Sequence, residues 1–371
     1  MKLRFKKHVA LTLISLMLLS LIGCGKPAST DTTTTTEAAV TEAPAASISD
    51  AATTADSTPA DASEEGSDAQ TVYPVTVTDQ AGREVTIEKE PESIVSGYYI
   101  STSLLLALGL KDKVTGIEAK ADKRPIYKLA APEFLELPNV GTAKEFDLET
   151  CASLSPELVI LPMKLKDAAQ SLSELDIPVL LVNPESEDQL EQMIELVSTA
   201  TNTKENADAL LSYIDEKKEM LEKDLSGVDA KSVYLAGNSS LLSTAGPAMY
   251  QSGLIELAGG KNAASEITDT YWAEISYEQL LAWDPSYIIL ASDAEYTPED
   301  VLNDENLKEC TAVKNGNVYA IPGDIEALDS PVPGGILASI WLAGILHPDQ
   351  VSADMYTEEK AAFYETFYGI K

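Results

Sequence analysis

The chain has 371 residues, with 26 Lys and Arg against 60 Asp and Glu, which gives a net charge of −34. This balance argues against a nucleic-acid partner, because phosphate backbones are bound by clustered basic side chains and the chain contains only three Arg. Apolar residues make up 44% and charged residues 23%, a composition typical of a globular protein. The length allows one large or two medium domains.

The first 23 residues have the features of a secretory signal. Four basic residues between positions 2 and 7 precede an apolar stretch from Val9 to Ile22, which is too short for a stable membrane-spanning helix. The stretch ends Leu21-Ile22-Gly23-Cys24, which resembles the lipobox of bacterial lipoproteins. We expect residues 1–23 to be removed and Cys24 to carry a lipid. The alternative is an ordinary signal with a chance Cys.

Residues 24–71 are expected to form a tether. From position 25 to 70 the chain is mostly Thr, Ala, Ser, Asp and Glu, without an aromatic residue. Such a segment cannot bury enough apolar surface to offset its ordering entropy, so we expect it to be disordered. As a flexible coil it would hold a domain about 35 to 40 Å from its anchor. This arrangement suits a protein on the outer face of a bacterial cytoplasmic membrane.

Residues 72–202 have the pattern of a first α/β lobe. A β-hairpin is predicted from the alternating runs 75–78 and 84–87 around a turn at 79–82. Short apolar strands then alternate with helical stretches, an order that produces a mostly parallel sheet covered by helices. The predicted strands are residues 93–96, 114–117, 158–161 and 179–182.

Residues 227–371 repeat the pattern in a second α/β lobe, and residues 203–226 join the two. The predicted strands there are 233–236, 287–290 and 317–321, with helices at 248–258, 277–282 and 334–346. The stretch from Thr203 to Leu225 has no Pro or Gly and predicts a helix about 35 Å long. Because nothing in it can absorb a kink, we expect a rigid connection. The cleft between the lobes is the expected ligand site.

Several short motifs occur in a characteristic order. They are residues 74–79, 82–87, 91–96, 105–110, Val140-Gly141, Leu148-Glu149, 154–160, 177–179, 258–262, 275–280 and Val318-Tyr319. Together they resemble the periplasmic-binding domain of iron-complex and cobalamin ABC importers. The resemblance covers about residues 74 to 371. It rests on the order and spacing of the motifs, because no single motif is diagnostic.

The resemblance implies an extracytoplasmic solute receptor that is not an enzyme and needs no cofactor or metal of its own. Such a receptor is a monomer that captures a small-molecule metal chelate, here most readily an iron–siderophore or similar iron complex. It delivers the chelate to a permease dimer and its ATPase. In that family one Glu on each lobe docks onto permease Arg residues, and the matching positions are Glu149 and Glu278. Two ordinary solvated acids are the alternative.

The candidate ligand residues lie in loops at predicted strand ends. Tyr and Trp offer a flat apolar face with a polar tip, suited to stacking on the organic shell of a chelate. For each Tyr, packing in the core is the alternative. The candidates are Tyr98, Tyr99, Arg124 and Lys164 in the first lobe and Tyr271, Trp272 and Glu326 in the second.

The charge of the chain restricts the ligand. Few Arg are available, so a strongly anionic chelate is disfavoured unless Arg124, Lys120 or Lys164 reaches the cleft. A neutral or weakly charged chelate of the hydroxamate or citrate type fits better. Bare zinc or manganese is disfavoured, because His347 is the only His after the signal.

Other functions stay open at this point. A corrinoid or haem receptor of the same fold is one alternative, and a haem receptor would use a Tyr or His ligand. A lipid-anchored hydrolase is another, since glycoside hydrolysis requires only two carboxylates. No G-x-S-x-G elbow, P-loop or G-x-G-x-x-G motif supports an enzyme.

Replacement of Cys24 tests the anchor. We expect Cys24→Ser to release the protein from membranes into the medium, or to leave it unprocessed, because the acceptor thiol is lost. Fractionation of cells followed by immunoblotting measures this. Unchanged membrane retention with normal cleavage would contradict the lipoprotein assignment.

Overall fold

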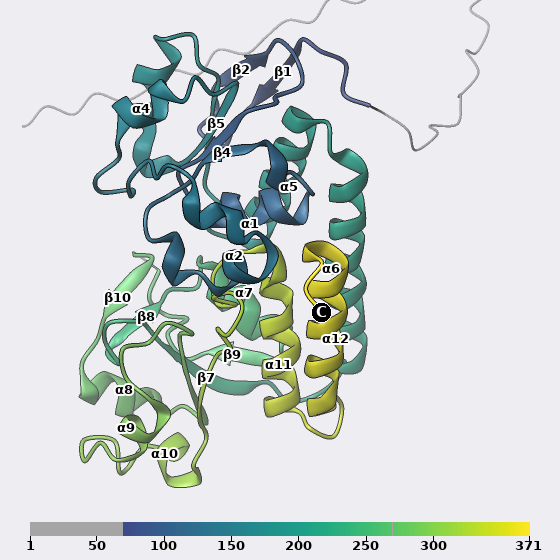
Figure 1. Cartoon of the computed structure of the whole chain (residues 1–371). Helices are drawn as coiled ribbons and strands as arrows, with labels where there is room; N and C mark the ends of the chain where they lie inside the picture. The colour runs from purple at the N-terminus through teal and green to yellow at the C-terminus, as the bar shows by residue number, and fades with distance from the viewer. Residues whose placement is uncertain (1–69, 269) are drawn as a thin grey trace, which may run out of the picture. The chain divides into compact units, whose positions relative to one another are not determined.

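The computed structural model describes residues 70–268 and 270–371. The expected signal, Cys24 and almost all of the expected tether lie outside these residues. In the described part of the chain, no helix combines the length and the apolar character needed to cross a membrane. Two α/β lobes with parallel sheets are present, as the sequence predicted (Figure 1).

The first lobe contains a hairpin and a parallel sheet. Strands β1 (Val75–Thr78) and β2 (Glu84–Ile87) pair antiparallel, as their alternation predicted. The main sheet has the order β4-β3-β5-β6, with parallel pairs throughout. Its strands are β3 (Ile94–Ser96), β4 (Val114–Gly116), β5 (Leu158–Pro162) and β6 (Val179–Val182). The helices are α1 (Tyr99–Ala107), α2 (Pro125–Ala130), α3 (Leu148–Ser153), α4 (Lys166–Ser173) and α5 (Glu187–Thr201), with short 3₁₀ turns η1 (Lys111–Lys113), η2 (Ala121–Lys123), η3 (Pro132–Glu136) and η4 (Met163–Leu165).

The second lobe repeats this design with an added strand pair. Its parallel sheet has the order β12-β11-β7-β9, formed by β7 (Lys231–Ala236), β9 (Gly260–Asn262), β11 (Tyr287–Leu290) and β12 (Val318–Ala320). The sequence did not predict β8 (Ser243–Ala245) and β10 (Trp272–Glu274), which pair antiparallel in a separate small sheet. The helices are α7 (Tyr250–Leu257), α8 (Tyr277–Trp283), α9 (Pro298–Leu302), α10 (Thr311–Asn315), α11 (Ile336–Leu346) and α12 (Ala353–Tyr368), with the 3₁₀ turn η5 (Pro333–Gly335).

A long helix connects the lobes, and a second helix runs beside it. Helix α6 (Lys204–Asp224) agrees with the predicted connecting helix. Helix α12, which the sequence did not predict, lies alongside α6 and α11 (Figure 1). Its Glu359 accepts a hydrogen bond of 2.9 Å from the Tyr213 hydroxyl and lies 3.0 Å from the Lys217 ammonium. Two helices therefore support the lobe arrangement.

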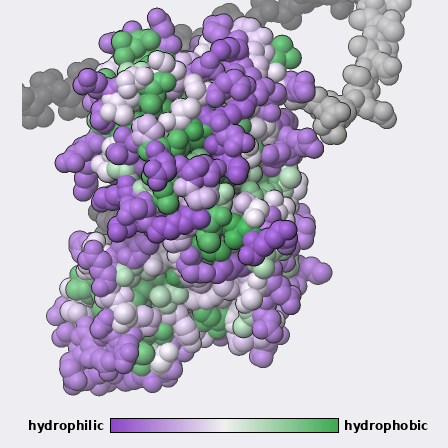
Figure 2. Space-filling view, viewed as in Figure 1, coloured by the Kyte–Doolittle hydropathy of each residue, from purple (hydrophilic) through white to green (hydrophobic). Residues whose placement is uncertain are grey.

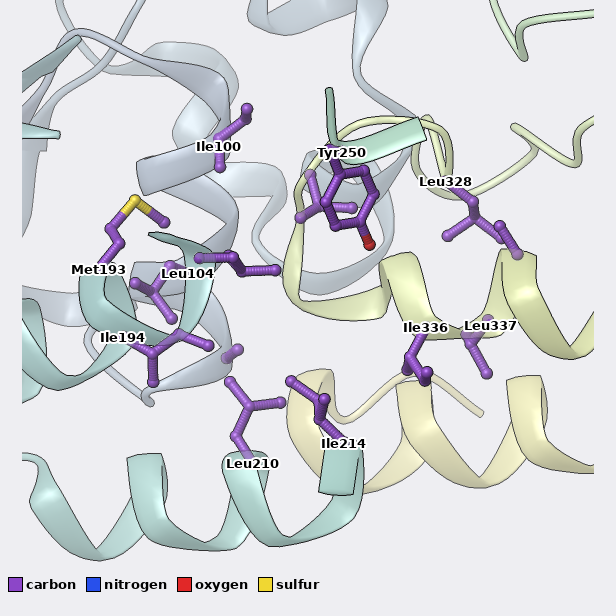
Figure 3. Packing of buried hydrophobic residues seen from close by; sticks show 14 of the residues in the cluster. Ile100, Leu104, Met193, Ile194, Leu210, Ile214, Tyr250, Leu328, Ile336 and Leu337 are labelled. Atoms are coloured by element: carbon purple, nitrogen blue, oxygen red, sulfur yellow. The ribbon is translucent and has the colours of Figure 1, made fainter. Parts of the chain in front are cut away.

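One hydrophobic core extends through both lobes. Figure 3 shows side chains from α1, α5, α6, α7 and α11 gathered in the same cluster. Leu104, Met193, Leu210 and Leu337 are fully buried in it. Burying each such side chain stabilises the fold by about 1.5–3 kcal/mol. Separating the lobes would therefore expose apolar surface as well as bend α6.

This construction predicts that the lobes move little when ligand binds. Small-angle scattering of the protein, with and without saturating ligand, should give nearly the same radius of gyration, because α6 has no Pro or Gly and the core is shared. A decrease of several ångströms on ligand binding would contradict the expectation.

Candidate functional site

The carboxyl ends of strands from the two parallel sheets lead into segments that contact one another. Tyr99 follows β3 in the first lobe, and its hydroxyl donates a hydrogen bond of 2.9 Å to Oγ of Ser330, which follows β12 in the second lobe. The backbone N–H of Ile126 donates to the carbonyl of Ile325 at 3.1 Å. Loops at strand carboxyl ends are where α/β proteins place their ligand sites. The cleft therefore lies where the two sheets meet.

A small cavity occupies this cleft. Tyr99, Ser103 and Arg124 line it from the first lobe, and Asp293, Ile325 and Glu326 from the second. Its volume is about 30 Å³, far below the roughly 300–1,000 Å³ of pockets that enclose an organic ligand. Only the smallest groups of a ligand fit inside the cavity in this conformation.

Arg124 is held at the wall of the cavity. Its guanidinium carbon lies 4.0 Å from the ring centroid of Tyr99, a cation–π geometry. One guanidinium nitrogen lies 4.0 Å from a carboxylate oxygen of Asp293 in the other lobe. Burial raises the pKa of Tyr99, so its hydroxyl remains a donor. The site thus presents one ordered cation against an aromatic face.

Glu326 forms another wall of the same cavity and is only 5% exposed. One of its carboxyl oxygens accepts a hydrogen bond from the Ser103 hydroxyl, and the other accepts one of 3.1 Å from Tyr364. Burial raises the pKa of Glu326 to about 7. Both oxygens therefore have protein partners, and the carboxyl is close to its titration point at neutral pH.

The structure brings only some of the predicted ligand residues together. Tyr99, Arg124 and Glu326 line the cavity. Tyr98 is partly buried, with its ring centroid 5.4 Å from that of Tyr99. The other three candidates, Lys164, Tyr271 and Trp272, are exposed and do not line it.

Trp272 nevertheless lies beside the carboxyl end of β7, a strand of the second parallel sheet. It begins β10, and its indole lies so close to Gly237, which follows β7, that a Cβ there would be 3.0 Å from the ring. Its side chain is 39% exposed, and that of Tyr271 is 56% exposed. Both aromatic residues are therefore accessible to solvent on the second lobe.

Sequence reasoning missed Ser103 and Asp293. Ser103 lies one helical turn after Tyr99, so the i, i+4 spacing places both on one face of α1. Asp293 lies three residues beyond β11, in a loop at the carboxyl end of a strand, where ligand-site residues are expected. Both signals were available in the sequence. The hydroxyl of Tyr364 carried no such signal, because it belongs to the unpredicted helix α12.

The two predicted docking acids occupy equivalent places in the two lobes. Glu149 is the second residue of α3, and Glu278 is the second residue of α8. Both side chains are exposed. Asp147 caps α3 and Ser276 caps α8, each by accepting a hydrogen bond from a backbone N–H in the first turn. The pKa of Glu278 is lowered by a backbone N–H and by the hydroxyl of Ser276.

The segments that follow these helices also match. Ser155 after α3 and Asp284 after α8 both have positive φ, at 48° and 42°. Each is followed by a Pro, and the chain then enters a buried parallel strand, β5 or β11. The same helix–turn–strand unit is thus built twice, with one exposed Glu at the start of each copy.

Comparisons with known proteins agree on one family. A family model described as "Periplasmic binding protein" matches residues 94–325. The uncharacterized ABC transporter substrate-binding lipoprotein YvrC of Bacillus subtilis is 29% identical over 273 residues, 70% of this chain and 82% of YvrC. The petrobactin-binding protein YclQ of Bacillus subtilis is 23% identical, over 66% of this chain and 79% of YclQ.

A solved structure supports the fold. The molybdate-binding protein MolA of Haemophilus influenzae is 24% identical over 79% of this chain and 90% of its own length. Its crystal structure with molybdate aligns with a TM-score of 0.71, over 80% of this chain and 98% of MolA. The family model covers more than half of the chain, and the fold agrees with it. The chain belongs to the periplasmic binding protein family, whose relatives named above include substrate-binding proteins of ABC transporters.

Proposed function

We propose that this substrate-binding protein captures a metal chelate, most readily an iron–siderophore or similar iron complex, and delivers it to an ABC permease. The observation that carries the proposal is the Arg124 guanidinium, stacked on Tyr99 in a cleft shared by both lobes. It is joined there by Lys123, while Asp293 supplies the facing carboxylate. An ordered cation of this kind suits a ligand that carries a weakly anionic group.

This arrangement removes the objection that the scarcity of Arg raised against anionic chelates. Arg124 does reach the cleft, whereas Arg83 is held in the hairpin by Asp79 at 2.7 Å. With Asp293 facing Arg124, the two cations of this site favour a chelate with little net negative charge over a highly charged one. Among the relatives, YclQ is a petrobactin-binding protein and MolA is a molybdate-binding protein.

The size of the cavity directs the bulk of the ligand to the mouth of the cleft. This cavity encloses only about 30 Å³, so the organic shell of a chelate would rest outside it. Tyr98, Lys164, Tyr271 and Trp272 are our candidates for the contacts there. Stacking on exposed Tyr271 and Trp272 would cover apolar ring faces that water now contacts.

A corrinoid or haem receptor is the second candidate, and the exposed aromatic pair favours it because flat macrocycles stack on such faces. His347 does not supply an axial ligand in this arrangement. It is buried, and its Nε2 lies 2.9 Å from the carbonyl oxygen of Gly259. Of the Tyr and His ligands expected for a haem, this arrangement favours a Tyr.

We further propose that the protein acts as a monomer anchored by lipidated Cys24 on the outer face of the membrane. In this arrangement Glu149 and Glu278 contact Arg residues of the permease, one from each lobe. Charge-assisted pairing of this kind requires exposed carboxylates, and both side chains are exposed.

Ligand identity can be measured by native mass spectrometry of the purified protein with a panel of iron and cobalt complexes. We expect stoichiometric binding of an intact iron chelate. Tyr99→Ala and Trp272→Ala should each weaken that binding roughly tenfold, because each removes an aromatic contact. Recovery of a cleaved product would indicate a hydrolase, and exclusive binding of a cobalt corrinoid would favour the second candidate. Unchanged affinity in both variants would refute the aromatic contacts.

Charge reversal tests the docking acids. Glu149→Lys and Glu278→Lys should each reduce uptake by about tenfold or more while leaving solution affinity unchanged, because like charges would then face the permease. Glu205→Lys is the matched control, since Glu205 is also the exposed second residue of a helix, α6. Uptake of radiolabelled chelate by cells gives the readout. A large loss of affinity in solution, or an equal loss of uptake in the control, would argue against docking.

A further inference from the structure

Three contacts join the lobes around one segment of the second lobe, residues 323–332. We call this group the lobe seam: Tyr99, Ser103 and Ile126 of the first lobe with Ile325, Glu326 and Ser330 of the second. The segment runs from the end of β12 to the start of η5. It contributes much of the second-lobe wall of the cavity. Any change at the seam therefore changes the cleft.

Glu326 lies where three parts of the molecule meet at this seam. Ser103 reaches it from α1, one turn after Tyr99 and on the same helix face. Tyr364 reaches it from α12, at 3.1 Å. Tyr368, also on α12, lies 2.9 Å from the Ser103 hydroxyl. One carboxyl thus fastens α1 and α12 to the second-lobe wall.

The surroundings of this carboxyl are poor in compensating charge. The titratable and charged groups around it are Tyr99 on α1, Lys123 and Arg124 before α2, Tyr127 on α2, Asp293 after β11, Asp324 and Asp329 on its own segment, and Lys360, Tyr364 and Tyr368 on α12. Lys360 is bound to Asp324 at 2.8 Å. Arg124 is the cation that acts on Glu326, and it also faces Asp293.

Burial makes the ionised form of Glu326 costly in the closed seam. Burial raises its pKa to about 7, although the hydroxyls of Ser103 and Tyr364 and the charge of Arg124 oppose the rise. The pKa values of Tyr364 and Tyr368 are also raised, mainly by burial, so both hydroxyls stay protonated. If the seam opens, water reaches the carboxyl and its pKa falls toward its ordinary value.

We infer that Glu326 is a proton-dependent latch: its protonated carboxyl holds α1 against residues 323–332, and ionisation loosens this contact and the ligand cleft beside it. The latch concerns regulation of the cleft and so rests on the proposed function. A protonated carboxyl still bonds both partners, because it can donate one hydrogen bond and accept another.

The pH dependence of seam closure is set by the difference in proton affinity between the closed and the open seam. The closed seam binds the proton more tightly than the open seam, so closure is favoured by acid. The stabilisation is present below the ordinary pKa of a Glu and is lost as the pH rises through about 7. Between the ordinary pKa of a Glu and about 7, where the open seam is ionised and the closed seam still holds its proton, closure weakens by about tenfold per pH unit, and above about 7 it changes no further.

Hydrogen–deuterium exchange of the ligand-free, full-length protein measures the seam directly. Labelling times are scaled to the intrinsic exchange rate at each pH, and peptides from α1 and from residues 323–332 are followed. We expect their exchange to accelerate by about tenfold per pH unit between about pH 5 and pH 7 in the wild type and to level off above that range. In Glu326→Gln, which keeps the shape without the charge, the acceleration should disappear.

Two further variants complete the test. Glu118 is another buried acid whose pKa burial raises, but its partners Thr102 and Tyr127 belong to the first lobe. Glu118→Gln should therefore retain the wild-type pH response in residues 323–332. Ser103→Ala removes a hydroxyl that favours the ionised form of Glu326, so the pH at which the exchange of the seam peptides changes should move upward. This variant tests the latch even if Glu326→Gln does not fold.

Absence of a pH response in the wild type, its persistence in Glu326→Gln, or an unmoved midpoint in Ser103→Ala would each overturn the latch. No ligand is used, so these outcomes leave the proposed function untouched. Failure to bind any chelate would remove the role of the latch in ligand capture, while the pH response of the seam would still be measured by itself.

Discussion

The shared hydrophobic core determines where every functional group of the molecule can lie. It runs from α1 and α5 across α6 to α7 and α11, so the two parallel sheets meet in a fixed relation (Figure 3). Their strand ends then bring Tyr99 within hydrogen-bonding distance of Ser330 and Arg124 close to Asp293. Because interiors are packed as densely as organic crystals, such a core resists continuous deformation. Small changes at the lobe seam are therefore easier than a large swing of the lobes.

Charge is distributed unevenly between the surface and the cleft. Hydrophilic residues cover most of the face in Figure 2, and the chain carries a net charge of −34. This surplus repels an anionic ligand at a distance, but salt screens exposed charges within about 8–10 Å. Inside the cleft, Arg124 acts at short range, where screening is weaker. One ordered cation can thus select a ligand that the surface as a whole does not attract.

Most strands of the two parallel sheets, the lobe order and α6 could be predicted from the sequence because each is a local pattern, whereas β8, β9 and β10 were missed. Leu158–Pro162 is a buried apolar run, and Lys204–Asp224 lacks helix breakers. Helix α12 was missed, since its aromatic residues are weaker helix formers than Leu or Ala and its polar half resembles a loop. The surroundings of Glu326 could not be inferred, because Ser103 is 223 positions away in the sequence. Local patterns carry no information about such pairs.

In the second lobe, a short segment connects the proposed ligand contact Trp272 with the proposed docking residue Glu278. Strand β10 begins with Trp272, and only Ile275 and Ser276 separate its end from α8, which carries Glu278. The N–H of Ile275 bonds the carbonyl of Leu242 at 2.8 Å, so this short connection is anchored to the lobe. Under the proposed function, a ligand that stacks on Trp272 acts on the strand that positions Glu278. Because the segment is short and hydrogen-bonded, a shift of the indole would in that case reach Glu278 without any movement between the lobes.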